Sequence, residues 1–206
     1  MTIKRILCFG DSNTWGYIPG SGERFSKHSR WPGVMAGLLG DSFEIVEEGL
    51  NGRTTVWDDP IEGDKCGIRH LPICLESHRP LDLVILMLGT NDLKHRFSLT
   101  PFDIAAGAER LVQYAHQFGT PVVLISPPPV QPNEELKEMF QGAETKSNHL
   151  GSHYSIVAER NSCAFLDLAS ILTVDPLDGI HYSAASHQIL GKKLAEIVKE
   201  IFPEGS

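Results

Sequence analysis

The sequence predicts an α/β fold in which helices cover both faces of a parallel sheet. Two observations support this: short apolar runs have the length and composition of strands buried on both faces, and segments with helical periodicity separate them. Strands that alternate with helices form a parallel sheet, because each helix returns the chain to the same edge. The length of 206 residues suits one domain, which we expect to span residues 1–206. The five apolar runs cover residues 3–9, 43–47, 81–88, 121–126 and 163–166.

The first apolar run ends abruptly in the turn Gly10-Asp11-Ser12. In a parallel sheet, ligands bind beyond the carboxyl ends of the strands, so this turn would place Ser12 at the binding edge. Ser12 is therefore a candidate nucleophile. The alternative is an ordinary turn in which Ser12 only caps a helix.

Two further motifs also follow apolar runs. Gly49-Leu50-Asn51-Gly52 comes after the second run, and Leu88-Gly89-Thr90-Asn91-Asp92 comes at the end of the third. Glycine at position 52 lets the backbone approach a substrate closely, and the neutral Asn91 side chain donates hydrogen bonds without taking a proton. We expect both residues at the same edge as Ser12. Taken alone, Gly52 could be a loop glycine and Asn91 a helix cap.

The two clearest helices flank the second half of the chain. Residues 100–118 begin with Thr100 as the N-cap and end before Gly119, a typical stop. Residues 183–201 carry an apolar stripe with the helical period. The motif Asp178-Gly179-Ile180-His181 comes just before this last helix, in a loop that we expect at the binding edge.

Together, these motifs contain the groups of a serine hydrolase. A serine hydroxyl needs a base to take its proton, which His181 could do, and Asp178 could hold the imidazole in the required tautomer. A developing oxyanion needs preorganised donors, each worth about 3 kcal/mol of barrier. The Ser12 and Gly52 backbone N–H groups and the Asn91 amide are suited to that role. If the four motifs were unrelated turns and caps, they would have to occur in this order at successive strand ends by chance.

Two segments are irregular and read as insertions. Residues 53–71 contain Asp58-Asp59-Pro60 and little periodicity, and residues 127–147 open with three prolines and include a possible short helix around 134–140. Long loops in a compact domain are usually functional or interfacial. We therefore expect the chain to form a homo-oligomer, with residues 53–71 involved.

Composition excludes several classes of partner. The formal net charge of −8 argues against a nucleic-acid groove, which needs a dense Lys/Arg surface. No apolar stretch approaches the ~20 residues needed to span a bilayer, so we expect no membrane partner. The four cysteines have no C-x-x-C spacing and read as structural thiols, which favours a reducing compartment and a cytoplasmic location.

The four motifs, in their order, resemble the conserved blocks of the SGNH/GDSL hydrolases. The resemblance covers essentially the whole chain and implies a flavodoxin-like three-layer α/β/α sandwich with a five-stranded parallel sheet. It also implies that Ser12 is the nucleophile, that His181 is the base with Asp178 as its partner, and that Gly52 and Asn91 belong to the oxyanion hole.

The first two blocks also look like those of the arylesterase/acyltransferase subgroup. They read Gly10-Asp11-Ser12-Asn13-Thr14-Trp15-Gly16 and Glu48-Gly49-Leu50-Asn51-Gly52-Arg53-Thr54-Thr55. Position 13 is Asn where the name motif of the superfamily has Leu, a change that could alter the helix start or the polarity of the pocket.

Other residues near the motifs are weaker candidates. Trp15, Trp57 and Phe140 are candidate pocket walls, and the alternative for Trp15 is a ring packed under the first helix. Arg53 is better explained by a structural salt bridge with nearby acidic residues than by substrate binding. His149 and His153 have a spacing that can ligate zinc, but no third ligand is evident. We therefore expect no metal and no cofactor.

These observations predict a serine esterase that cleaves small or aryl esters through an acyl-Ser12 intermediate. An alcohol or peroxide could intercept this intermediate, giving acyl transfer or perhydrolysis. The alternatives are a carbohydrate O-deacetylase with the same mechanism, a thioesterase or lysophospholipase, and a binding module that has lost turnover.

Overall fold

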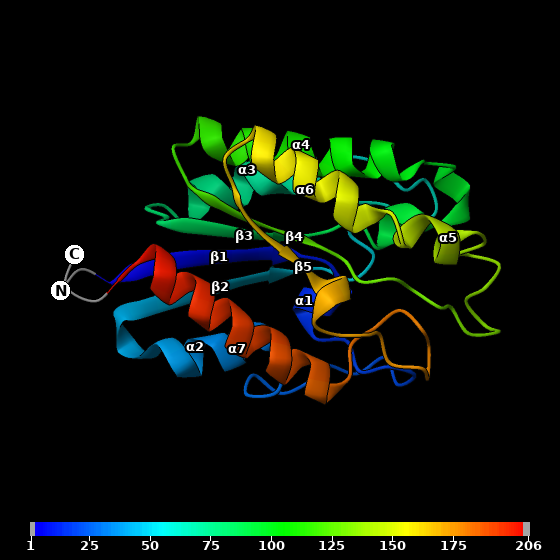
Figure 1. The fold of residues 1–206 in the computed structure, drawn as a ribbon, viewed down its shortest axis with the longest axis horizontal. Helices are drawn as coiled ribbons and strands as arrows, with labels where there is room; N and C mark the ends of the chain where they lie inside the picture. The colour runs from blue at the N-terminus through cyan, green and yellow to red at the C-terminus, as the bar shows by residue number, and fades with distance from the viewer. Residues whose placement is uncertain (1–2, 204–206) are drawn as a thin grey trace.

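The computed structural model describes residues 3–203 and centres on a parallel sheet (Figure 1). All neighbouring strands run parallel, in the order β2-β1-β3-β4-β5, so the first strand lies inside the sheet. Each strand falls within two residues of its predicted bounds, which confirms the predicted five-stranded sheet. The strands are β1 (Lys4–Gly10), β2 (Phe43–Gly49), β3 (Leu83–Met87), β4 (Val122–Ser126) and β5 (Ala164–Asp167).

Helices cover both faces of this sheet and complete a three-layer sandwich (Figure 1). One face carries α2 (Trp31–Leu39) and α7 (Ala184–Ile201). The other carries α3 (Gly67–Ser77), α4 (Pro101–Gln117) and α6 (Leu150–Arg160). The predicted α/β/α architecture is thereby confirmed.

Alternation along the strands divides the core between the two faces. In β1, Ile6 and Cys8 join the cluster beneath α2 and α7, whereas Leu7 and Phe9 join the cluster beneath α3, α4 and α6. All four are fully buried. Burying a large apolar side chain stabilises a fold by roughly 1.5–3 kcal/mol, so an apolar run with no polar break can persist only in a strand covered on both sides.

Side-chain caps form the predicted starts of α4 and α7. The Thr100 hydroxyl accepts a hydrogen bond from the Asp103 N–H at 3.2 Å, and the Asp103 carboxylate accepts one from the Thr100 N–H at 2.9 Å. At α7, the Ser183 hydroxyl accepts from the Ser186 N–H at 3.1 Å. Each such cap is worth about 1 kcal/mol and fixes where the helix begins.

The two irregular segments lie at the carboxyl ends of the strands. Residues 53–66 remain irregular until α3 begins. Residues 134–142 form turns, so the short helix predicted around 134–140 is wrong. The Gln131 and Asn133 N–H groups donate to the carbonyls of Gly179 (2.8 Å) and Asp178 (3.1 Å). These bonds hold residues 131–133 against the loop before α7. Beyond them the segment makes only isolated turns, with bonds from the Lys137 N–H to the Asn133 carbonyl (2.9 Å) and from the Phe140 N–H to the Leu136 carbonyl (3.0 Å), and no continuous helix.

Two α-helices of residues 3–203 are short. They are α1 (Ser12–Trp15), directly after β1, and α5 (Ala143–Ser147). Both lie at the end of the sheet to which the strand arrows point (Figure 1). Within residues 3–203, no helix combines the length and hydropathy needed to cross a bilayer.

Candidate active site

A tight turn at the end of β1 presents Ser12. Asp11 caps α1, because its carboxylate accepts a hydrogen bond from the Asn13 N–H at 2.9 Å. Only glycine fits at position 10, where a β-carbon would lie 2.7 Å from the Met87 carbonyl oxygen and closer still to the Thr14 hydroxyl. The turn can therefore pass directly over β3, and it leaves Ser12 at the carboxyl edge with 5% of its surface exposed.

The structure brings Ser12, His181 and Asp178 into one hydrogen-bonded chain. The Ser12 Oγ lies 3.0 Å from the His181 Nε2, and the His181 Nδ1 lies 2.7 Å from the Asp178 Oδ2. The other Asp178 oxygen accepts the N–H groups of Ile180 and His181, each at 2.9 Å. This local turn is why a carboxylate three residues before an imidazole can face it.

The Asp178 carboxyl is held in its ionised form. Burial by itself would raise its pKa, but the hydrogen bonds from His181, the charge of that imidazole and the Ile180 N–H together bring the pKa below its ordinary value of 3.8. An ionised acceptor at Nδ1 keeps a proton on that nitrogen. The Nε2 lone pair then faces Ser12.

Gly52 and Asn91 lie at the same cavity as Ser12 and His181. Gly52 has φ +81°, and the Glu62 carboxylate occupies the space that a β-carbon would need. The Asn91 Nδ2 donates to the Arg53 carbonyl at 3.1 Å, which fixes the amide and leaves its second hydrogen for another acceptor.

The cavity has a volume of about 170 Å³ and two chemically different sides. We call Asn51, Glu62 and Lys94 its polar wall. We call Leu136, Met139, Phe140 and Ile180 its apolar wall. The remaining lining residues are Ser12, Tyr17, Gly52, Asn91 and His181.

Of the three predicted wall residues, only Phe140 lines this cavity. Trp15 does not line the cavity, and the Arg24 guanidinium lies 5.0 Å over its ring. Trp57 does not line it either, and its side chain packs against the core cluster beneath α4. The salt bridge expected for Arg53 is absent from the ion pairs of residues 3–203. Its guanidinium donates to the Gly10 (2.9 Å) and Glu48 carbonyls and lies 4.1 Å over Phe9.

Tyr17 is a site residue that sequence reasoning missed. Its ring stacks on the His181 ring, with centroids 4.1 Å apart and an interplanar angle of 24°. The stacking covers one face of the imidazole. No periodicity or motif spacing in the sequence indicates Tyr17, because its contact with His181 depends on the conformation of the loop that follows α1.

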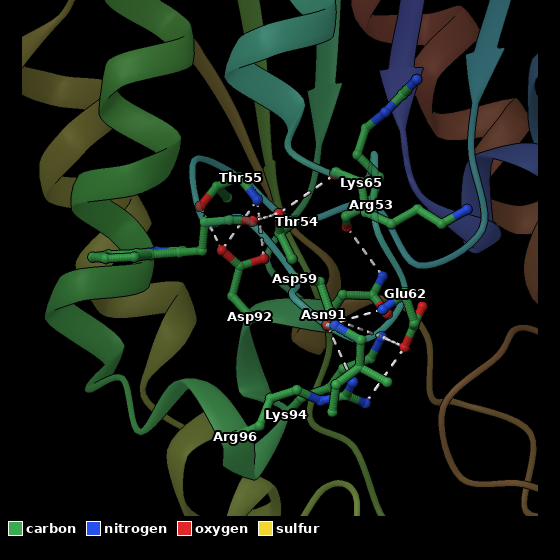
Figure 2. A network of polar contacts seen from close by, with 12 residues as sticks. Arg53, Thr54, Thr55, Asp59, Glu62, Lys65, Asn91, Asp92, Lys94 and Arg96 are labelled. Atoms are coloured by element: carbon green, nitrogen blue, oxygen red, sulfur yellow. Dashed lines mark hydrogen bonds and ion pairs between the residues drawn. The ribbon is translucent and has the colours of Figure 1, made fainter.

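The polar wall is held by a cluster of four charges, which Figure 2 shows beside Asn91. Lys94 is 3% exposed; its ammonium pairs with the Glu62 carboxylate and lies 3.9 Å from that of Asp59. Arg96 contacts the same two carboxylates at 3.2 and 3.4 Å. Two cations thus neutralise two anions. Burial would raise the pKa of Asp59, but the Ile61 and Glu62 N–H groups, with Arg96 and Lys94, hold it below 3.8.

A second buried carboxylate ties the loops after β2 and β3 together. The Asp92 oxygens accept the Thr55 N–H at 3.1 Å and also the Thr55 hydroxyl, a contact visible in Figure 2. Burial raises the pKa of Asp92 to about 6, against the lowering effect of these bonds. Gly52 and Asn91 are carried by the two loops that this contact joins.

The histidine pair considered for zinc lies apart from the site. His149 immediately precedes α6, and the His153 ring packs edge-on against Phe102 at 6.3 Å. Across residues 3–203, no cluster of three or more His, Cys, Asp or Glu side chains has the geometry to hold a metal ion.

Comparison with solved structures finds esterases among the similar proteins. The aryl esterase of M. smegmatis is 43% identical, with a TM-score of 0.94, and the match covers 97% of this chain and 100% of that one. A carbohydrate acetylesterase from Sinorhizobium meliloti is 39% identical, also with a TM-score of 0.94 and with the same coverage. A lipase/acylhydrolase from Enterococcus faecalis shares the fold, with 21% identity and a TM-score of 0.73 over 99% of this chain and all of that one.

A search of curated proteins found no match. The model of the GDSL-like lipase/acylhydrolase family matches residues 8–189, which include every motif described above. The chain therefore belongs to the GDSL-like lipase/acylhydrolase family.

Proposed function

We propose that the protein is a serine esterase that cleaves small or aryl carboxylic esters through an acyl-Ser12 intermediate. The observation that carries this proposal is the hydrogen-bonded chain from Ser12 through His181 to Asp178, which opens into a cavity of about 170 Å³. The M. smegmatis aryl esterase, similar over nearly the whole chain, supports the substrate class.

The geometry suits each step of ester cleavage. The His181 Nε2 takes the Ser12 proton as Oγ attacks the ester carbonyl, and the Asp178 carboxylate stabilises the imidazolium that forms. The carbonyl oxygen becomes an oxyanion, which accepts hydrogen bonds from the Ser12 and Gly52 N–H groups and the Asn91 amide. When the C–O bond breaks, His181 returns the proton to the leaving alcohol. Water then repeats the sequence and releases the acid from Ser12.

A carbohydrate O-deacetylase is the second candidate, and the polar wall favours it. Asn51, Glu62 and Lys94 can hydrogen-bond to the hydroxyl groups of a sugar, and the S. meliloti neighbour is a carbohydrate acetylesterase. Both candidates share the same acyl-Ser12 chemistry. They differ in the alcohol that leaves.

Acyl transfer to an alcohol or peroxide, self-association and a cytoplasmic location stay predictions. The apolar wall supports acyl transfer, since an apolar surface disfavours water near the intermediate. Ile61, within the irregular segment 53–66, is largely exposed and supports a subunit contact there. Buried thiols such as Cys8 and Cys74 support a reducing compartment.

The test is hydrolysis of a p-nitrophenyl ester series from acetate to long acyl chains, beside acetylated sugars, with Ser12→Ala as the control. We expect rapid cleavage that falls steeply beyond short acyl groups and disappears in Ser12→Ala. Faster release of acetate from sugars would favour the deacetylase. Cleavage that is undiminished in Ser12→Ala would contradict the mechanism.

A further inference from the structure

Resting on the proposed function, we propose that the Asn13 side chain is a positioning residue that holds the base His181 within reach of the nucleophile Ser12. Asn13 follows Ser12 in α1 and is 1% exposed. It does not line the cavity, so its effect on the reaction would pass through the residues that it binds.

The Asn13 amide binds both peptide groups that flank His181. Its Nδ2 donates to the Ile180 carbonyl at 3.3 Å, and its Oδ1 accepts the Tyr182 N–H at 3.1 Å. The side chain thereby imitates the peptide of a neighbouring strand. Among the hydrogen bonds of residues 3–203, these two and the Ser12–His181 bond are the ones that join α1 to residues 180–182.

The other contacts of His181 control different properties. Asp178 sets the tautomer and the rotation of the ring, and Tyr17 covers one ring face. Neither contact fixes the distance between the backbone of the base and the backbone of the nucleophile. Asn13 does so, because its own N–H is already bound to the Asp11 carboxylate at the cap of α1.

Asparagine suits this position because one planar group must both donate and accept. Leucine has a similar volume but offers neither a donor nor an acceptor, and aspartate offers only acceptors. Since the site is buried, no bulk water can replace the lost partner, and two peptide groups would be left unsatisfied. A misplacement of about 1 Å at a catalytic pair can cost on the order of 100-fold in rate.

The experiment compares Asn13→Leu and Asn13→Asp with the wild type. We expect kcat for p-nitrophenyl acetate to fall roughly 10- to 100-fold in Asn13→Leu, with KM changed less than about threefold, because the base and not the cavity is displaced. Asn13→Asp, which retains the acceptor for Tyr182, should lose less. Amide hydrogen exchange at Tyr182, measured by NMR, should accelerate in Asn13→Leu.

Asn161→Leu is the matched control. Asn161 is partly buried, and its amide donates to Glu109 and to the Val157 carbonyl, far along the chain from Ser12. It should lose stability without losing kcat. If Asn13→Leu fails to fold, Asn13→Asp alone decides the matter through kcat, because it keeps the acceptor for Tyr182 and loses only the donor to Ile180.

Two outcomes separate the possible failures. Wild-type kcat in a folded Asn13 variant, with or without faster Tyr182 exchange, would overturn the role of Asn13 while the esterase proposal stands. A wild-type protein with no Ser12-dependent hydrolysis would overturn the proposed function, and the positioning role with it.

Discussion

The two walls of the cavity keep their shape in different ways. The polar wall comes from the loops after β2 and β3, where Lys94 and Glu62 belong to the four-charge cluster. The apolar wall comes from residues 136–140 and Ile180, and it is held by packing and by backbone bonds such as that from the His95 N–H to the Met139 carbonyl at 2.7 Å.

The difference between the two walls indicates which side of the cavity needs a precise geometry. Charge-assisted hydrogen bonds are directional, whereas apolar contacts are not. The proposed oxyanion donors Gly52 and Asn91 lie on the two loops that the polar wall joins. The wall beside the chemistry is therefore the directional one, and the wall that would contact the variable part of a substrate is the adaptable one.

The largest effect should come from Asn91→Ala. This change removes a proposed oxyanion donor and should lower kcat by roughly 10²- to 10³-fold. The measurement is steady-state hydrolysis of p-nitrophenyl acetate, with folding checked by circular dichroism. A decrease smaller than about threefold would show that the Asn91 amide serves only to bind the Arg53 carbonyl.

The next effect should come from Lys94→Met, which breaks the polar wall while nearly preserving its shape. Because it leaves the buried Asp59 carboxylate and the neighbouring Glu62 carboxylate with one cation instead of two, the free energy of unfolding should fall by about 3 kcal/mol. Urea denaturation measures this fall. Lys193→Met is the control, since Lys193 pairs with Glu196 on the surface and should cost no more than about 1 kcal/mol. Equal losses in the two variants would mean that the cluster is not a structural anchor.

Acid should weaken the polar wall through Asp59. Its pKa lies below 3.8 in the folded state, so its ionised form stabilises the fold above that pH, and this stabilisation is lost as the pH falls through the lowered pKa. The stability difference between wild type and Asp59→Asn should therefore be largest above about pH 4 and shrink towards pH 3. Urea denaturation across this range measures it. A difference that stays constant with pH would contradict the role of the Asp59 charge.

The smallest effect should come from Met139→Ala in the apolar wall. Met139 is 39% exposed, so stability should change little. The shorter side chain should favour acyl groups one or two carbons longer, by up to about tenfold in kcat/KM. The p-nitrophenyl ester series measures this change, and Ile156→Ala, at a distant exposed site, is the control. An unchanged chain-length preference would show that the acyl group does not contact this wall.

Local rules explain why the fold was predictable. An apolar run without a polar break, or a Thr-Pro pair before a periodic segment, specifies a strand or a helix start from a few neighbouring residues. The sequence also indicated Ser12, His181 and Asp178 for the same reason. Each belongs to a short motif beside a strand or helix end, and the parallel sheet brings those ends together.

The walls were less predictable, because their contacts depend on how distant loops fold. No residue near Lys94 in the sequence predicts its ion pair with Glu62, which lies 32 residues earlier. Trp15 stands three residues after Ser12, yet its ring packs against Arg24. Proximity in sequence is a weak guide wherever a side chain has a competing partner from another loop.

The separation of Ser12 and His181 by 169 residues also has a consequence for protein synthesis. Ribosomes add about 5–20 residues per second, so the proposed nucleophile is made between roughly 8 and 34 seconds before its proposed base. During that interval the nascent chain carries a serine hydroxyl with nothing to take its proton. A messenger truncated before codon 178 would therefore yield a polypeptide without esterase activity, however well its first strands had folded.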